Sequence, residues 1–322
     1  MTEKQNELFD FAMQYLRKND LIFGYLATLP MKKNDAYRYA FSWTVIRYID
    51  EIIDSSRNLS EKRQTLDKFN NLIDLITNGL IEKSEMGDKF EECLYEYLEM
   101  DDASDVKTLS FFQNVLKSFD IDITRTEKVL SWKEYDKYLF YRSDSVLELY
   151  YSLFFNESSK KISEYAKDYA RSFQYVDDVC DYYKDFSIGQ INITEDEVKK
   201  LEIKDVNLKD NLEAKNFAKY RKELVLKHYF RFIENVDKSL YSFHIKRYLK
   251  ESIGYNIYPI IVNKFKPGKE IKLPFKSLIL FLTSLKKQSK MFPFFHYFMY
   301  LYCLVPWYSY SPKKAEKQRK IA

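Results

Sequence analysis

The sequence predicts an all-α protein, and two observations carry this prediction. Only six Gly and seven Pro occur among 322 residues, which leaves few turns and little room for the many hairpins of a β-rich fold. Apolar residues recur at spacings of three and four, as in 9–16 and 66–76, and this period is typical of amphipathic helices. No internal repeat or linker is evident, so we expect one helical domain over residues 1–285 and a distinct segment over 286–322.

Candidate breaks divide the domain into successive helices. They lie at 29–30, 57–58, 101–105, 156–160 and 189–194. Thr194 followed by Glu197 is a capping-box signature that predicts the start of a short helix. The polar stretch 204–215 is expected to be a loop, and the amphipathic stretch 217–236 a helix.

Charge and cysteine content exclude some classes of function. Lys and Arg number 52 against 48 acidic residues, whereas nucleic-acid binding usually shows a concentrated basic stripe. We therefore expect no nucleic-acid partner. Cys93, Cys180 and Cys303 form no zinc or disulfide pattern and fit a reducing cytoplasm. The first ten residues are charged and polar, so no secretory signal is expected.

The C-terminal segment predicts a contact with a membrane surface. Residues 291–310 carry no formal charge, and about 20 apolar residues suffice to span a bilayer. Two Pro and five Tyr interrupt this stretch, however, and Lys flanks both ends, whereas a span usually biases positive charge to one side. Peripheral contact at the inner face of the membrane therefore fits better than a span, with a buried terminal helix as the alternative.

Two acidic clusters, at 47–54 and 174–185, indicate the chemistry of the chain. Carboxylates recur in them at four-residue spacing: Asp50 and Asp54, then Asp177, Asp181 and Asp185. Residues four apart share a helix face, where unpaired carboxylates repel one another unless a cation lies between them. Oxygen ligands without His or Cys suit Mg²⁺, or Mn²⁺ in its place. The alternative is two solvated helix faces, but apolar neighbours such as Ile49 and Val176 place both clusters beside a core.

Facing clusters of this kind could hold a metal–diphosphate complex. Positive charge stabilises a departing diphosphate, and departure from an allylic carbon leaves a carbocation. Water would quench that cation, so the cavity must be dry and apolar. Aromatic faces stabilise a cation by about 0.5–2 kcal/mol each, and the chain contains 28 Tyr and 25 Phe.

Several motifs resemble those of the squalene/phytoene synthase family over roughly residues 16–276. "IFGYLATLP" and then "AYRYAFSWTVIRYIDEIID" are similar to the N-terminal segment of that family, which leads into Arg-x-x-Asp-Asp-x-x-Asp. "YARSFQYVDDVCDYYKDFSIGQINIT" resembles its second signature, Gln-x-x-Asn-x-x-x-Asp-x-x-x-Asp followed by Gly-Arg-x-Tyr. The resemblance implies a single-domain isoprenoid synthase fold, a helical bundle around a central cavity.

The resemblance also implies roles for single residues. The five aspartates would bind Mg²⁺, with Asp177 at a position where the family usually has Asn. Arg47 and Gln174 match positions that contact the diphosphate or order the ligands. Tyr255 in "SIGYNIYPII" and Lys276 in "KLPFKSL" match late positions near the phosphates, against alternatives of a core aromatic and a surface lysine.

The chain departs from the family pattern at several of these positions. Glu51 replaces the usual second Asp, Cys180 stands in place of an Arg, and Gln190 replaces the Arg of Gly-Arg-x-Tyr. In "YLFYRSDSVLELYY", Asp144 and Leu147 are bulkier or more polar than the small residues expected along the hydrocarbon channel. These changes leave open how many prenyl chains the protein holds and how long they are.

The leading functional prediction is Mg²⁺-dependent, head-to-head coupling of two prenyl diphosphates, with farnesyl diphosphate as the expected substrate. One alternative uses a single prenyl diphosphate and cyclises it, hydrolyses it to an alcohol or transfers it to another acceptor. A second alternative is a non-catalytic assembly factor. No Gly-x-Gly-x-x-Gly fingerprint is present, but NADPH is not excluded, because enzymes can bind it without that motif.

Overall fold

The computed structural model describes residues 2–29, 31–55, 57–155 and 159–239, together with the single positions 246, 249 and 267. Over these residues it confirms the predicted all-α class. No strand is present in them, and one isolated bridge joins Leu130 to Thr194. The predicted sites Tyr255 and Lys276 and the whole C-terminal segment 286–322 lie outside the described residues. No helix in the described part of the chain has the length and apolar character needed to cross a membrane.

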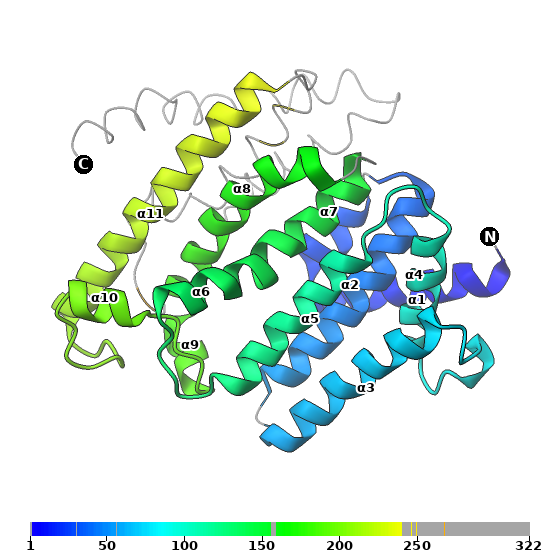
Figure 1. Ribbon diagram of the computed structural model, residues 1–322, viewed down its shortest axis with the longest axis horizontal. Coiled ribbons are helices and arrows are strands. Elements are labelled where there is room, and N and C mark those ends of the chain that lie inside the picture. The colour runs from blue at the N-terminus through cyan, green and yellow to red at the C-terminus, as the bar shows by residue number, and fades with distance from the viewer. Residues whose placement is uncertain are drawn as a thin grey trace.

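Successive helices pack as one bundle (Figure 1). Two segments, η1 and η3, are π-helices, and η2 is a short 3-10 helix. The elements in order are α1 (Glu3–Asn19), η1 (Leu21–Leu26), α2 (Lys33–Ile53), α3 (Leu59–Thr77), η2 (Lys83–Glu85), α4 (Lys89–Asp102), α5 (Leu109–Thr124), α6 (Trp132–Leu139), η3 (Phe140–Asp144), α7 (Ser145–Phe155), α8 (Ser159–Cys180), α9 (Tyr182–Ser187), α10 (Glu195–Lys200) and α11 (Asn211–Lys238).

Side-chain caps explain where several helices begin. The predicted capping box at Thr194 and Glu197 is confirmed, and it starts α10. Asn58 caps α3 by accepting a hydrogen bond from the Glu61 N–H at 3.0 Å. The predicted loop over 204–215 extends too far, because Asp210 accepts hydrogen bonds from two backbone N–H groups and starts α11 at residue 211. An N-cap aspartate is worth about 1 kcal/mol, which explains the early start.

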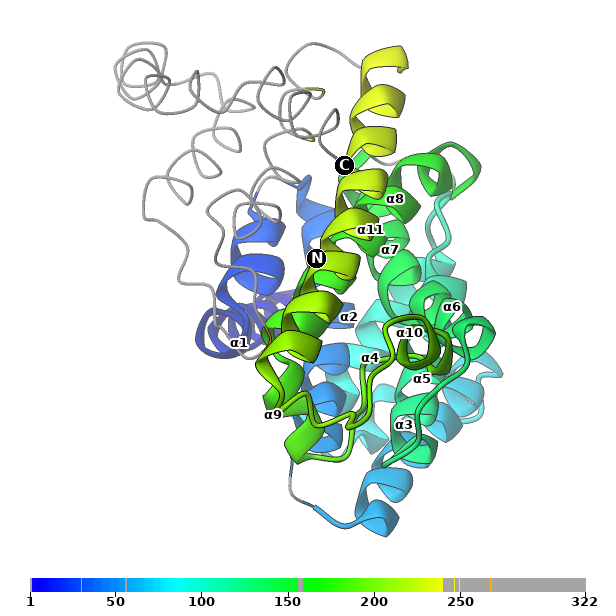
Figure 2. The ribbon, with the colours of Figure 1, turned by 90° about the vertical axis from the view of Figure 1, so that its left-hand side faces the viewer.

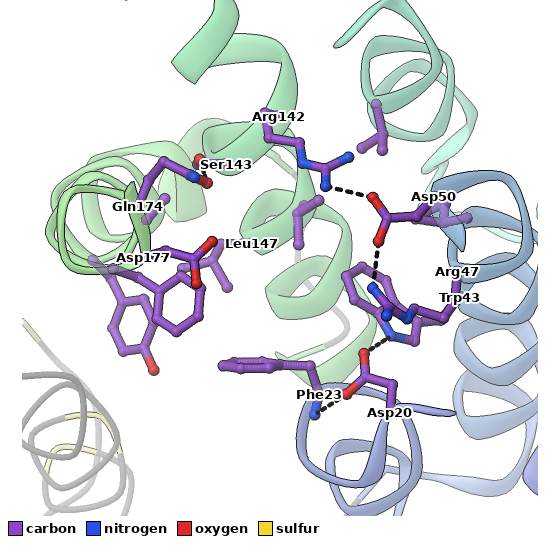
Figure 3. Close-up of a pocket in the computed structure, with 16 residues that line it drawn as sticks. Asp20, Phe23, Trp43, Arg47, Asp50, Arg142, Ser143, Leu147, Gln174 and Asp177 are labelled. Carbon is purple, nitrogen blue, oxygen red and sulfur yellow. Dashed lines mark hydrogen bonds and ion pairs between the residues drawn. The ribbon is translucent and has the colours of Figure 1, made fainter. Parts of the chain in front are cut away.

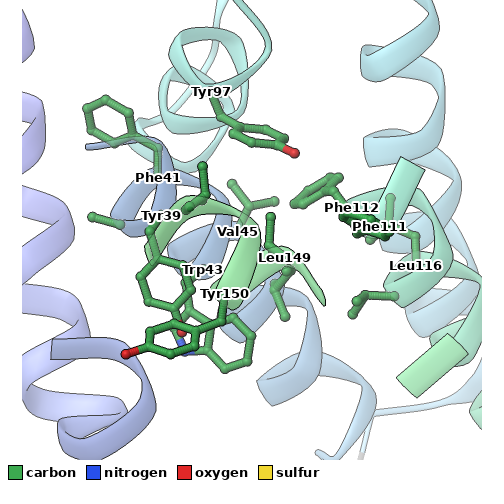
Figure 4. Close-up of a cluster of buried hydrophobic side chains, with 14 of the residues drawn as sticks. Tyr39, Phe41, Trp43, Val45, Tyr97, Phe111, Phe112, Leu116, Leu149 and Tyr150 are labelled. Carbon is green, nitrogen blue, oxygen red and sulfur yellow. The ribbon is translucent and has the colours of Figure 1, made fainter. Parts of the chain in front are cut away.

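The main hydrophobic core surrounds α2, which is buried along most of its length. Its aromatic side chains pack against those of neighbouring helices, among them Tyr97 of α4 and Phe112 of α5 (Figure 4). Tyr39 and Tyr150 make an edge contact with ring centroids 5.3 Å apart, which ties α2 to α7. Because this core holds α2 rigidly, it also fixes the acidic cluster at the end of that helix.

A second core lies where α8 and α11 run side by side (Figures 1 and 2). It encloses the fully buried Arg221, whose guanidinium pairs with Glu197 at 2.7 Å and with Asp178 at 3.1 Å. The same guanidinium lies 4.8 Å from the ring centroid of Tyr135. This network holds Asp178 in the interior. Adjacent residues on a helix point about 100° apart, so Asp177 is left to face another side of α8.

The second acidic cluster is not on one helix, as the four-residue spacing had predicted. Helix α8 ends at Cys180, Asp181 lies at a bend, and α9 begins at Tyr182. The Asp181 N–H still donates to the Asp177 carbonyl at 2.8 Å, and the Asp185 N–H donates to the Asp181 carbonyl at 2.9 Å. Because these bonds bridge the bend, the backbone keeps helical hydrogen bonding between the three aspartates.

Candidate active site

A cavity of about 180 Å³ lies between α2 and α8 and is bounded by both π-helices. Figure 3 shows Asp50 and Arg47 on one wall, Asp177 and Gln174 on the opposite wall, Arg142 between the two walls, and Phe23 and Asp20 on η1 and the residue before it. The lining residues are Asp20, Phe23, Trp43, Ile46, Arg47, Asp50, Val115, Arg142, Ser143, Val146, Leu147, Tyr169, Ala170, Phe173, Gln174 and Asp177.

Both polar and apolar side chains line this cavity. Aromatic rings form much of the apolar part, where Phe23 meets Phe173 edge-on with centroids 5.0 Å apart. Trp43 also lines it and donates its indole N–H to the Asp20 carboxylate at 2.8 Å. An apolar chamber joined to a charged wall suits a ligand with a hydrocarbon end and an anionic end.

Four of the predicted site residues line this cavity: Arg47, Asp50, Gln174 and Asp177. Gln174 accepts a hydrogen bond from the Ser143 hydroxyl at 2.8 Å and donates one to Asp178 at 3.0 Å. It therefore connects η3 to α8.

The remaining aspartates continue the charged wall away from the apolar chamber. Asp54 accepts a hydrogen bond from Gln190 at 3.3 Å, and Asp185 accepts one from Asn192 at 2.7 Å. The Gln190 N–H also donates to the Asp185 carbonyl at 2.9 Å. The residue that replaces the expected Arg thus joins the two acidic clusters, which lie 120 to 138 residues apart in the sequence.

Burial and mutual repulsion raise the pKa values of these carboxyl groups. Burial raises the pKa of Asp177 to about 7, with Asp181 and Asp178 adding to the effect. Burial and the neighbouring Asp177 raise the pKa of Asp185 to about 8. The pKa of Asp54 rises to about 6 because of burial and the nearby Asp50 charge.

Asp50 behaves in the opposite way because it is ion-paired on both oxygens. Arg47 donates to one oxygen, and Arg142 donates to the other at 2.5 Å. Burial alone would raise the pKa of Asp50, but the two guanidinium groups hold it below the usual value.

Sequence reasoning missed Arg142, Ser143 and the role of Asp20. Arg142 and Ser143 lie in η3, and Asp20 directly precedes η1. π-helical turns frequently occur at functional sites, but they change the register of side chains in a way that a 3.6-residue pattern does not reveal. Within "YLFYRSDSVLELYY", Leu147 lines the cavity as expected. Asp144 instead turns away to bind Arg171 at 3.2 Å.

The donor set at this site fits a hard divalent cation. Its ligand atoms are carboxylate oxygens, and several of these carboxylates repel one another. Arg47, Arg142 and Lys184 lie beside them and offset part of this charge. Mg²⁺ usually takes one or two protein carboxylates together with water and phosphate oxygens. Among the described residues no three His, Cys, Asp or Glu side chains converge as a preformed metal centre.

Comparison with known proteins agrees with this architecture. Residues 29–234 match the family described as "Squalene/phytoene synthase". The fold is similar to a dehydrosqualene synthase in complex with ligand, with a TM-score of 0.66 and 15% identity over 90% of this chain and 99% of the other. It is also similar to squalene synthase HpnC from Alicyclobacillus acidocaldarius, with a TM-score of 0.65 and 11% identity over 83% and 98% of the two chains. No curated protein matches the sequence.

The fold and the family match define an all-α protein of the isoprenoid synthase type. The chain belongs to the squalene/phytoene synthase family. The predicted family and fold class are therefore confirmed, and the comparisons support an isoprenoid synthase enzyme.

Proposed function

We propose that this protein is a Mg²⁺-dependent prenyltransferase that couples two prenyl diphosphates head-to-head and releases diphosphate. The observation that carries the proposal is that one cavity contains both charged and aromatic side chains. Its charged wall includes Asp50, Asp177 and Arg47, and aromatic rings line its apolar chamber. Such a cavity can bind both ends of a prenyl diphosphate.

The charged wall would hold the diphosphate and its metal ions. Asp54, Asp177, Asp181 and Asp185 would hold Mg²⁺, while Asp50 binds two arginines. Bound Mg²⁺ supplies positive charge that stabilises diphosphate as a leaving group. Arg47 lines the cavity and would bind the phosphate oxygens directly.

The apolar chamber would bind the hydrocarbon chain and exclude water. Trp43, Tyr169 and Phe173 line it, and an aromatic face stabilises a nearby cation by about 0.5–2 kcal/mol. Leu147 and Val146 from α7 add aliphatic surface. A cation formed in this chamber is therefore held away from bulk water until it reacts.

The lining of the cavity favours a second candidate, an enzyme that uses one prenyl diphosphate. Leu147 lines the chamber at a position where the family pattern has small residues, and its bulk leaves less space for a second hydrocarbon chain. In this candidate the cation is cyclised, captured by water or transferred to another acceptor.

Product analysis separates the two candidates. Purified protein is incubated with Mg²⁺ and radiolabelled farnesyl diphosphate, and the lipid extract is analysed. Coupling predicts a C30 hydrocarbon or its cyclopropyl intermediate, whereas products with 15 carbons alone support the single-substrate reaction. Release of no diphosphate from any prenyl substrate would refute both and favour a non-catalytic role.

A further inference from the structure

The Asp50 carboxylate lies between two guanidinium groups in the cavity and accepts a hydrogen bond from one of them on each of its oxygens (Figure 3). Arg47 comes from α2 and Arg142 from the π-helix η3. The carboxylate side chain is only 7% exposed, whereas those of Arg47 and Arg142 are 33% and 24% exposed. The carboxylate is thus covered by the two arginines, which themselves reach the open space.

Both guanidinium groups retain unused hydrogen-bond donors. Among the described residues, the Arg142 side chain makes a single hydrogen bond, which goes to Asp50. Because a guanidinium has five N–H donors, the other donors of Arg142 are unused. Its planar group lies 4.9 Å from the ring centroid of Phe119, which restricts its orientation. The Nε atom of Arg47 is buried and lacks a hydrogen-bond partner among the described residues. It lies 3.9 Å from a carboxylate oxygen of Glu51, within ion-pair distance but too far for a hydrogen bond.

Charge and shape indicate what these donors could bind. The two guanidinium groups are the positively charged groups among the residues that line the cavity, and Asp20, Asp50 and Asp177 line it as well (Figure 3). The planar fork of arginine matches the oxygens of a phosphate group and can bind them bidentately. A ligand with several phosphate oxygens would satisfy the unused donors without leaving the carboxylate of Asp50 unpaired.

We propose that Arg47 and Arg142, positioned by Asp50, form an arginine pair that binds the substrate diphosphate directly. This inference rests on the proposed function and extends it, because it adds Arg142 to the diphosphate-binding residues and gives Asp50 a positioning role. Arg142 becomes a phosphate-binding residue of η3. Asp50 becomes a positioning residue for the two arginines, because each of its oxygens accepts a guanidinium N–H group.

Calorimetric titration of the full-length protein with inorganic diphosphate tests the arginine pair. Each protein is titrated once in Mg²⁺ and once in EDTA. Arg142→Gln should weaken binding about 10- to 100-fold in both buffers, the usual range for losing a charge-assisted hydrogen bond. Arg142→Lys keeps the charge but not the fork, so its affinity should fall by about threefold or more. The control Arg63→Gln, which removes a surface ion pair with Asp120, should leave binding unchanged.

Asp50→Asn distinguishes a positioning role from metal ligation. If Asp50 positions the arginines, this variant weakens diphosphate binding but keeps the wild-type ratio between affinities in Mg²⁺ and in EDTA. Loss of that ratio would show metal ligation and overturn the assignment of Asp50. Thermal unfolding checks that each variant is folded, and Arg142→Lys decides the question if Arg142→Gln does not fold.

Two results would overturn the inference, and they differ in what they say about the proposed function. If wild-type protein binds diphosphate and both Arg142 variants bind it equally well, the arginine pair is wrong but the proposed function stands. If wild-type protein binds no diphosphate even with Mg²⁺, both are wrong.

Discussion

Replacement of Asp177 by Asn should stabilise the metal-free protein while weakening its binding of metal and diphosphate. The Asp177 carboxyl has its pKa raised from an ordinary 3.8 to about 7, through burial and then through Asp181 and Asp178. The folded state therefore favours the protonated acid. Stability that is fully present below about pH 4 is lost progressively as the pH rises to about 7.

The magnitude follows from the pKa difference between the folded and unfolded states. At about 1.4 kcal/mol per pH unit, ionising Asp177 in the folded protein costs at most roughly 4 kcal/mol above pH 7. Because the neighbouring carboxyl groups titrate together and share this cost, we expect Asp177→Asn to recover about 1–3 kcal/mol at pH 8. For a chain of this size this corresponds to a rise in Tm of about 2–6 °C.

The assay is thermal unfolding in EDTA at pH 5 and pH 8, with the exposed Asp67→Asn on α3 as a control. The advantage of Asp177→Asn should be larger at pH 8, and the control should show none at either pH. Adding Mg²⁺ with inorganic diphosphate should raise the Tm of wild type by more than that of the variant, since only binding to the folded state stabilises it. A variant that melts at or below wild type at pH 8 in EDTA would refute the reasoning.

Three further predictions concern the core, the chamber and the turn after α9. Arg221→Met leaves two buried carboxylates unpaired and should cost about 3–5 kcal/mol in urea unfolding; a loss below about 1 kcal/mol would contradict this. Leu147→Ala enlarges the chamber and should raise the kcat/KM ratio for C20 over C15 diphosphates, at a stability cost of about 2–5 kcal/mol; an unchanged ratio would argue against Leu147 as a chain-length determinant. Gly189 has φ +83°, and a Cβ atom there would lie 2.8 Å from Thr126 Cγ2. Gly189→Ala should therefore lower the free energy of unfolding by about 1–3 kcal/mol. An unaltered Tm would contradict this prediction.

Local features of the fold were predictable because their causes lie close together in the sequence. Apolar spacing predicted α3, and Leu66, Phe69 and Ile76 are all buried on it. The capping box at Thr194 involves residues three apart and was read correctly. The start of α11 was misplaced because the N-cap Asp210 lies in a stretch whose many charges resemble a loop.

The candidate site was predictable in part. Four-residue spacing placed Asp50 and Asp54 on one helix end, and the structure brings this pair near Asp185, where Gln190 bridges the clusters. The spacing of residues could not show which of the adjacent Asp177 and Asp178 faces the cavity. Asp178 is drawn into the core by Arg221, which lies 43 residues away, and this leaves Asp177 on the cavity wall.

By itself, the sequence determined the helical class, several of the breaks between helices, the family motifs and the presence of two clusters of repelling carboxylates. These depend on backbone hydrogen bonding and on side chains within a few residues of one another. Only the tertiary structure decided that Arg142, 92 residues from Asp50, would pair with it, and that two π-helical turns would bound the cavity. The physical reason is that a cavity wall is assembled by packing between distant helices, and no local pattern encodes which ion pairs that packing brings together.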